Sequence, residues 1–483
     1  MVVDSVKTTA FLVQGLATLK ISFLAALIGF VYAWPSYTLS NFRSADTVLS
    51  APMSSLEISL LGSLTNVGGL LATPLCGYLL NKLGRKYTAM LFGLPFVISW
   101  SVISITNYVP LILCAVGISG FGAAGQVLTT VYIAEISQDA VRGAFTSIIS
   151  VGYFLGLLLS YSWGGFLTFY EVVYLHLGLS ILYLAMSMFL KESPVFLVQR
   201  GRDEEAARSI AFYRRVNVTS REVEVELKKI KLQLKTIANE NDAQTTDALI
   251  ENKLTGEAAR SDSAWQFLLK SESSKRALTT CLIIMIIKTF MGAVTLQVYA
   301  EPLFKMAVPD INTYNCIIFM AIVNVAASII CSLLIDRLGR KFLMITSSVG
   351  SGVCTFLLGT QMLFNWAPGI FTAVIMYAFA FIYIVGANAV IFVLGGEVFL
   401  PEVRSLCNTF IMICMWSVNF AALVIFFPIV ENFGLHSAFF GFSVICFVGA
   451  LYCHFFLPET KGLSADEIQL LFVKNRKGTG GKS

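Results

Sequence analysis

Charged residues are scarce in this sequence. Only 13% of the 483 residues are Asp, Glu, Lys or Arg and 56% are hydrophobic, whereas ordinary soluble domains carry about twice that charged share. The 34 basic and 29 acidic residues cannot cover a soluble chain of two or three domains. The composition excludes most soluble proteins and a disordered chain. With a mean hydropathy of +0.76, it favours an all-α, polytopic membrane protein.

Histidine is scarcer still. His176 lies in one apolar segment, His436 and His454 lie near opposite ends of another, and no paired acids accompany them. The chain therefore has almost no side chains that could serve metal or acid–base catalysis. We expect no enzyme activity, no metal or other cofactor, and no nucleic-acid partner.

The apolar residues form windows long enough to cross a membrane, which takes about 20 residues per helix. The first window is too long for a signal peptide and has Trp34-Pro35 where cleavage needs small residues, so we expect it to stay as a span. The twelve predicted spans are 16–36, 58–80, 88–106, 110–132, 143–162, 170–190, 277–304, 314–335, 341–363, 369–394, 405–428 and 435–457.

Basic residues are confined to one side of this arrangement. Only Arg43 and Lys305 fall in odd-numbered loops, and only Lys288 falls deep inside a span. Because short loops rich in Lys and Arg stay in the cytoplasm, both termini are predicted to be cytoplasmic.

A charged stretch without a span divides the chain. Apolar residues recur there at helical spacing, which predicts short amphipathic helices, and residues 239–262 have the composition of a flexible linker. The alternative, a regulatory docking segment, has no motif behind it. The recurring residues are Val223, Leu227, Ile230, Leu234 and Ile237. The predicted domains are a six-helix bundle (1–190), a cytoplasmic linker (191–276), a second six-helix bundle (277–457) and a cytoplasmic tail (458–483).

The loops of the two halves repeat one another in order. Leu-Gly-Arg-Lys occurs at 83–86 and again at 338–341. Two further pairs follow the same order: Glu135 with Arg142 and Glu397 with Arg404, each seven residues apart, and then Glu192 and Glu459 after the sixth and twelfth spans. The offsets of 255, 262 and 267 residues are too regular for chance. The halves are thus predicted to be parallel, pseudo-symmetric repeats, as in one large class of secondary transporters.

The charges in these loops predict a gate at the cytoplasmic end. The glycine permits a tight turn, the Arg-Lys pair anchors the loop at anionic headgroups, and the acids are placed to pair with those bases. Such clusters can lock one end of the halves together while the other end is open. The alternative, basic anchors with incidental acids, leaves the acids and their spacing unexplained. The candidates are Arg85, Lys86, Glu135, Arg142, Glu192, Arg340, Lys341, Glu397, Arg404 and Glu459.

These loops are also where the chain resembles a known family. Residues 81–86 and 336–341 match the D-x-x-G-R-R/K loops of the sugar porter family of the major facilitator superfamily, and residues 132–136, 192–194 and 458–464 match further motifs in order. The resemblance covers nearly the whole chain and is strongest to insect facilitated trehalose transporters. It implies two six-helix bundles that alternate access to a sugar near mid-membrane, with the charged clusters stabilising the outward-open state.

The resemblance also implies which residues bind the sugar. Amides donate to and accept from hydroxyls, and aromatic rings stack on sugar C–H faces. Some positions of the family's cavity are matched and others are replaced. The matches are Tyr299, Asn324, Trp416 and Asn419; Phe392 stands where the family has Trp, Ser150 where it has Gln, and the Gln-Gln-x-Ser-Gly-x-Asn segment begins Lys288-Thr289.

Lys288 has two interpretations, because a lysine at the centre of a span is costly unless it faces water or a partner. Either it lines the cavity, where it donates to a substrate hydroxyl or attracts an anionic group, or the seventh helix starts later than 277 and the amine reaches an interface. The family alignment favours the cavity.

We predict a facilitative carrier of a neutral sugar, trehalose or a hexose, that works as a monomer in the lipid bilayer of the plasma membrane. Proton-driven members of the superfamily carry an aspartate in the first helix, and residues 21–36 contain no acid, which favours uniport. The alternatives are a non-transporting sugar sensor, which would tolerate the loss of cavity amides, and a carrier of a different small solute. The intact loop motifs favour transport.

Overall fold

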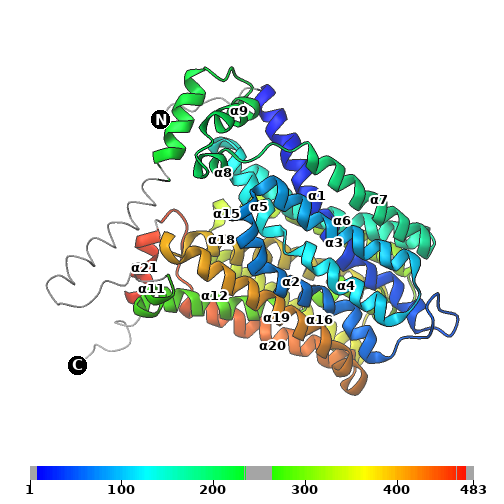
Figure 1. Ribbon diagram of the computed structural model, residues 1–483. Coiled ribbons are helices and arrows are strands. Elements are labelled where there is room, and N and C mark those ends of the chain that lie inside the picture. The colour runs from blue at the N-terminus through cyan, green and yellow to red at the C-terminus, as the bar shows by residue number, and fades with distance from the viewer. Residues whose placement is uncertain (1–7, 233, 235–263, 464, 475–483) are drawn as a thin grey trace, which may run out of the picture.

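The computed structural model describes residues 8–232, 234, 264–463 and 465–474, which form a bundle of long helices (Figure 1). Twelve helical segments in this part of the chain are long and apolar enough to cross a membrane. This confirms the predicted all-α, twelve-span membrane fold. The segments are Thr8–Arg43, Ser55–Leu83, Arg85–Ile105, Val109–Ile136, Ala140–Phe166, Phe169–Met188, Glu272–Val298, Thr313–Ile335, Arg340–Phe364, Gly369–Glu397, Leu406–Phe433 and Leu435–Phe456.

The first half contains six spans, the fourth of which is divided into α4 and α5. Capping boxes start two of them: Ser54 and Glu57 cap α2, and Thr168 and Glu171 cap α7, which satisfies backbone N–H groups that a helix start leaves open. The helices are α1 (Thr8–Arg43), α2 (Ser55–Leu83), α3 (Arg85–Ile105), α4 (Val109–Ala123), α5 (Gln126–Ile136), α6 (Asp139–Phe166) and α7 (Phe169–Met188).

The second half repeats this arrangement with two more interruptions. Its seventh span breaks between α12 and α13, and its tenth contains a π-helix, η1. The elements are α12 (Glu272–Phe290), α13 (Ala293–Val298), α14 (Ala300–Ala307), α15 (Thr313–Leu338), α16 (Arg340–Phe364), α17 (Gly369–Tyr383), η1 (Ile384–Asn388), α18 (Ala389–Glu397), α19 (Pro401–Phe433) and α20 (Leu435–Phe456).

Each interruption can be explained by a particular side chain or glycine. Gly292 has a φ of +96°, and a Cβ there would lie 2.6 Å from the Phe442 ring, so only glycine fits where α12 ends. In η1, the Ser347 hydroxyl donates to the Ile382 carbonyl and accepts from the Ala387 N–H, each at 3.0 Å. A side chain inserted into the helical ladder in this way is a common cause of a π-bulge.

Short helices gather at one end of the bundle, on the left of Figure 1. They are α8 (Pro194–Gln199), α9 (Asp203–Arg214), α11 (Ala264–Lys270), α21 (Ala465–Lys474) and residues 221–232. Val223 and Ile230 are buried against Ile210 of α9, so the predicted amphipathic spacing is found here. Ile237 and the expected linker at 239–262 lie outside the described residues. We call this end, which also holds the turns before α3 and α16, the charged-loop end.

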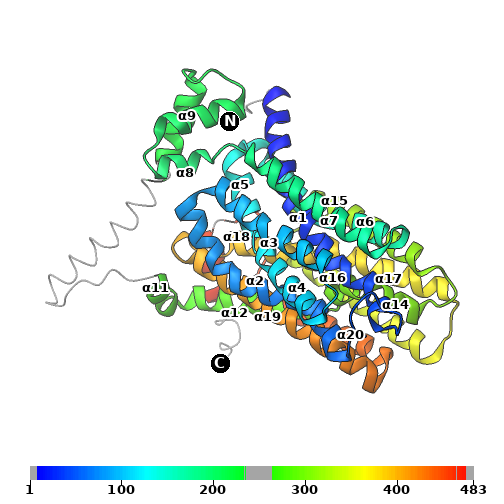
Figure 2. The same cartoon turned by 45° about the vertical axis from the view of Figure 1, so that its right-hand side comes forward.

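The two halves meet along two pairs of helices. α2 packs against α19 and α6 packs against α15, while α1 runs the length of the first half and reaches α13 and α14 of the second (Figure 2). Any solute that passes between the halves must therefore pass between these helices.

Candidate functional site

The first charged cluster forms at the turn between α2 and α3. Arg85 Nη2 lies 2.6 Å from Glu135 Oε1, and both side chains are largely buried. Arg85 Nη1 also donates to the Leu80 carbonyl. Glu192 accepts hydrogen bonds from the backbone N–H groups of Arg85 and Lys86, at 2.8 and 3.2 Å. A carboxylate here accepts from N–H groups that have no partner within α3. The positive end of the α3 dipole also stabilises its negative charge.

The second cluster reproduces this geometry between α15 and α16. Arg340 Nη2 lies 2.6 Å from Glu397 Oε1, and Arg340 Nη1 donates to the Ile335 carbonyl, again five residues earlier. Glu459 accepts from the N–H groups of Arg340 and Lys341 at 2.9 and 3.1 Å. The repeat in the sequence is therefore accompanied by a repeat of the same hydrogen bonds.

Two glycines make both clusters possible. Gly84 and Gly339 have φ of +91° and +89°, a conformation that side chains rarely adopt. A Cβ on Gly84 would lie 2.9 Å from Glu192 Cδ, and one on Gly339 would lie 2.9 Å from Glu459 Cδ. The carboxylate thus occupies the space that a side chain would need.

The clusters differ in two hydrogen bonds. Glu397 Oε2 accepts from Arg340 Nε at 3.2 Å and from Thr460 Oγ1 at 2.8 Å. In the first cluster Glu135 Oε2 and Arg85 Nε are buried without a hydrogen-bond partner. The second carboxylate is therefore held more completely than the first.

The remaining gate candidates also lie at this end. Arg142 donates to the Ser137 carbonyl at 3.5 Å, and Arg404 donates to the Phe399 carbonyl at 3.1 and 3.2 Å, so each arginine contacts a backbone carbonyl five residues earlier. Burial raises the pKa of the Glu192 carboxyl, and the N–H groups that it accepts from partly offset this.

Asn324 of α15 marks the middle of the bundle. Its side chain is 1% exposed, and neither its amide oxygen nor its amide nitrogen has a hydrogen-bond partner. Asn324 lines a cavity of about 10 Å³ with Gln297 and Tyr383, which is room for about one water. Buried amides are nearly always paired, so the Asn324 amide is an exception that keeps its donor and acceptor capacity unused.

Gln297, which the sequence interpretation did not include, connects the halves beside Asn324. Tyr153 donates to Gln297 Oε1 at 3.1 Å, and the Tyr161 hydroxyl donates to the Gln297 carbonyl. On the other side of Tyr153, Tyr32 donates to Asn66 Oδ1 at 2.9 Å. The sequence did carry a signal for Gln297 and Asn66, because each is a polar side chain within an apolar span.

Lys288 lies in the last turn of α12 and is 6% exposed. Its Nζ stands 4.6 Å from the centroid of the Phe392 ring, so the structure brings two of the predicted binding residues together. α12 begins at Glu272, before the predicted start at 277, so a later start does not explain this lysine. The ring and the negative end of the α12 dipole both favour the ammonium.

Trp416 of α19 and Tyr299, between α13 and α14, both contact α2. Trp416 Nε1 donates to Thr73 Oγ1 at 2.9 Å, and its indole covers Gly69, where a Cβ would lie 2.8 Å from the ring. The Tyr299 hydroxyl donates to the Leu423 carbonyl at 3.3 Å and approaches Gly62 in the same way. Both aromatic residues therefore join the two halves in this arrangement.

The other predicted binding residues are more dispersed. Thr289 and Asn419 are buried, and Ser150 is exposed on α6.

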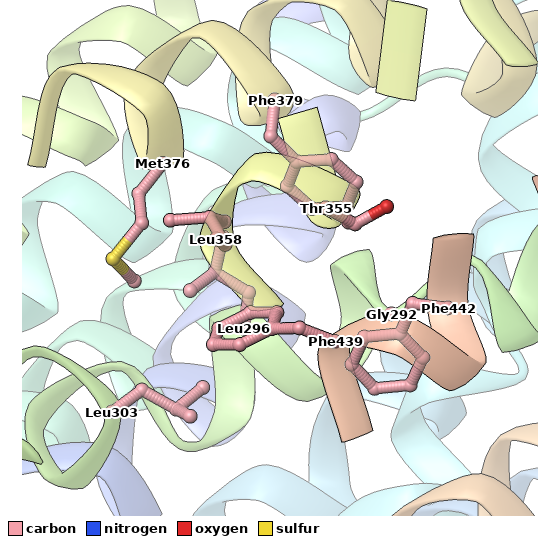
Figure 3. Close-up of a pocket in the computed structure, with 9 residues that line it drawn as sticks. All are labelled: Gly292, Leu296, Leu303, Thr355, Leu358, Met376, Phe379, Phe439 and Phe442. Atoms are coloured by element: carbon pink, nitrogen blue, oxygen red, sulfur yellow. The ribbon is translucent and has the colours of Figure 1, made fainter. Parts of the chain in front are cut away.

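A second cavity of about 10 Å³ next to Gly292 is lined mainly by apolar side chains, among them Leu296, Phe379 and Phe439 (Figure 3). Neither of these two cavities has room for a sugar.

The chain is similar to known proteins over nearly its whole length. A family model described as "Sugar (and other) transporter" matches residues 5–472. The facilitated trehalose transporter Tret1 of Culex quinquefasciatus is 27% identical over 467 residues, 94% of this chain and 85% of that protein. Tret1 of Polypedilum vanderplanki is also 27% identical, over 94% of this chain and 87% of that protein.

Solved structures show the same fold. The inward open xylose transporter XylE from E. coli matches with a TM-score of 0.74 at 21% identity, over 94% of this chain and 98% of that chain. XylE described as a proton:xylose symporter, bound to 6-bromo-6-deoxy-D-glucose, matches with a TM-score of 0.69 at 21% identity, over 94% of this chain and 99% of that chain.

Proposed function

The chain belongs to the sugar transporter family of the major facilitator superfamily, and on that premise we propose that it is a facilitative carrier of a neutral sugar, trehalose or a hexose. The sugar would bind between the halves near mid-membrane and be released by alternating access. The observation that carries this proposal is the buried, unpartnered amide of Asn324, because a sugar hydroxyl can both donate to and accept from an amide.

Uniport is supported by the absence of acid from α1. Thr8–Arg43 contains neither Asp nor Glu, so this helix offers no carboxylate that could load and release a proton. The relatives at 27% identity are named facilitated transporters, whereas XylE, at 21% identity, is named a proton:xylose symporter.

The charged clusters support a gate at the charged-loop end. Each Arg–Glu pair forms within its own half, and the first leaves Glu135 Oε2 without a partner. We propose that these carboxylates and arginines pair differently when the charged-loop ends approach each other. The distribution of basic residues supports termini on the cytoplasmic side, and we propose that the protein works as a monomer in the plasma membrane.

Uptake of radiolabelled trehalose and glucose into proteoliposomes tests the proposal. We expect Asn324→Ala to lower uptake about tenfold or more without lowering the melting temperature, because the amide has no hydrogen bond to lose in this structure. Asn107→Ala, in an exposed loop, is the matched control and should leave uptake unchanged.

Two results would contradict the proposal. Uptake that is unchanged in Asn324→Ala would remove this residue from the binding site. No uptake of any sugar by well-folded wild-type protein would leave the two alternatives, the non-transporting sensor and a carrier of a different small solute.

A further inference from the structure

Glu301 of α14 joins the two halves at the end opposite the charged loops. Ser40 of α1 donates to Glu301 Oε1 at 2.8 Å, and the Glu301 N–H donates to the hydroxyl of Ser36, one turn earlier on α1, at 2.9 Å. Both serines belong to the first half and Glu301 to the second. These bonds can form only while α1 and α14 are in contact.

The second oxygen of this carboxylate is not satisfied. Glu301 is 5% exposed, and its Oε2 is buried without a hydrogen-bond partner. An ionised carboxylate in this position loses its hydration at one oxygen and receives only one side-chain hydrogen bond in return. The neutral acid avoids most of that cost.

The groups around Glu301 do little to offset the burial. Lys305 lies one turn along α14, Tyr314 is the second residue of α15, and α17 contributes Tyr377, whose ring lies 6.0 Å from that of Phe304. α13 has no titratable side chain. Glu301 lies beyond the span that ends at Val298. Burial raises the pKa of its carboxyl, while Ser40 and Lys305 lower it by less.

The nearest basic side chain of α1 is paired elsewhere. Arg43 forms an exposed salt bridge at 3.3 Å with Glu431 of α19, which also accepts from Ser55. Glu431 therefore joins the same ends of the halves as Glu301 does, but in water. The side chains of this pair are 46% and 43% exposed.

We propose that the Glu301 carboxyl is a proton-binding site reached from the outer side, and that its protonation favours the arrangement in which the outer ends are joined. The inference rests on alternating access from the proposed function. When the outer ends part, Glu301 meets water and its pKa returns to the ordinary range. The proton comes from the outer solution and returns to it, so none is carried across and uniport is preserved.

The sign of the pH dependence follows from linkage. Because the carboxyl binds a proton more tightly when the ends are joined, the joined arrangement gains population as external pH falls. The gain is complete below the ordinary pKa of the carboxyl. It is lost as pH rises through the raised value. Each unit of difference between the two pKa values changes the ratio of arrangements by up to about tenfold.

A distance measurement without sugar tests this directly. Labels are placed on Asn107 and Trp366, exposed residues in outer loops of opposite halves, and the distance between them is followed in full-length protein in liposomes as external pH is lowered. We expect the short distance to gain population in the wild type. Glu301→Gln, which mimics the neutral acid, should show the short distance at every pH.

Two further variants keep the test decisive. Ser40→Ala removes the hydrogen bond that favours the ionised form, so the midpoint should move to higher pH. Glu431→Gln, the matched control at the exposed acid, should keep the wild-type pH dependence. A pH response that survives in Glu301→Gln, or a midpoint that Ser40→Ala does not move, would overturn the proposal.

Uptake measurements separate this inference from the proposed function. If the distance responds to pH through Glu301 but no sugar is taken up, the proton site stands and the transport proposal fails. If sugar is taken up and the distance does not respond, the proton site fails alone.

Discussion

Single polar residues in the apolar spans carry most of the functional information. Asn324, Gln297 and Lys288 lie in spans where each buried polar group is costly. Gln297 bonds to the first half, Asn324 lines a cavity beside it, and Lys288 contacts Phe392. Asn324 and Lys288 could be identified from the sequence, the first by resemblance and the second by its charge. The contacts of Gln297 and Glu301 could not be predicted, because only the packing of helices from opposite halves shows them. The polar side chain of Gln297 in an apolar span was the one available signal.

Lys288→Met tests whether the ammonium serves the substrate. Methionine keeps the length and apolar contacts of the side chain, so we expect the melting temperature to be unchanged or higher. Loss of a charged donor should raise the KM for sugar about tenfold or more. Lys275→Met, at the exposed start of the same helix, is the control. Unchanged KM and substrate range in Lys288→Met would indicate a structural role only.

At the scale of elements, the apolar windows were sufficient to predict all twelve spans but not their ends or interruptions. The first span, predicted at 16–36, extends over Thr8–Arg43, because the helix continues through polar residues beyond the apolar window. The π-helix η1 could not be predicted, since it depends on the Ser347 hydroxyl of another helix. The loop motifs were more informative, because their glycines and acids form local turns.

The turn before α3 gives a prediction about stability. We expect Gly84→Ala to destabilise the protein by about 2–4 kcal/mol, from the left-handed backbone and from contact with Glu192 and Phe196. Gly201 has a φ of +69° with no atom near an added Cβ, so Gly201→Ala should cost only about 1–2 kcal/mol. Melting temperatures in detergent compare the two variants. Equal losses would show that the carboxylate does not fill the turn as described.

For the whole molecule, the contact of α2 with α19 determines how closely the halves approach. The sequence could place Trp416 in the helix that the family uses for sugar binding, but not against Gly69 of the opposite half. Which residues meet there depends on the relative rotation of two separately folded bundles, and no local pattern encodes it.

Gly69→Ala tests this contact. An added Cβ would overlap the Trp416 indole at 2.8 Å, so the described arrangement should become less favourable by about 1–3 kcal/mol. The distance between labels on Asn107 and Trp366 should then shift toward longer values. Gly77→Ala in the same helix has no atom near the added Cβ and should leave the distribution unchanged. A shift in both variants would indicate a general effect on α2.

The unequal clusters have one more consequence, which concerns the central segment of the chain. Thr460 donates its hydroxyl to Glu397, but Ser193, at the corresponding position, uses its oxygen to cap α8 by accepting from Val195 and Phe196. In the described structure the first turn of α8 thus holds the Ser193 oxygen, and Glu135 Oε2 receives no hydrogen bond from it. Any partner or modification that unwinds α8 would release Ser193, and would in this way strengthen a salt bridge that it never touches.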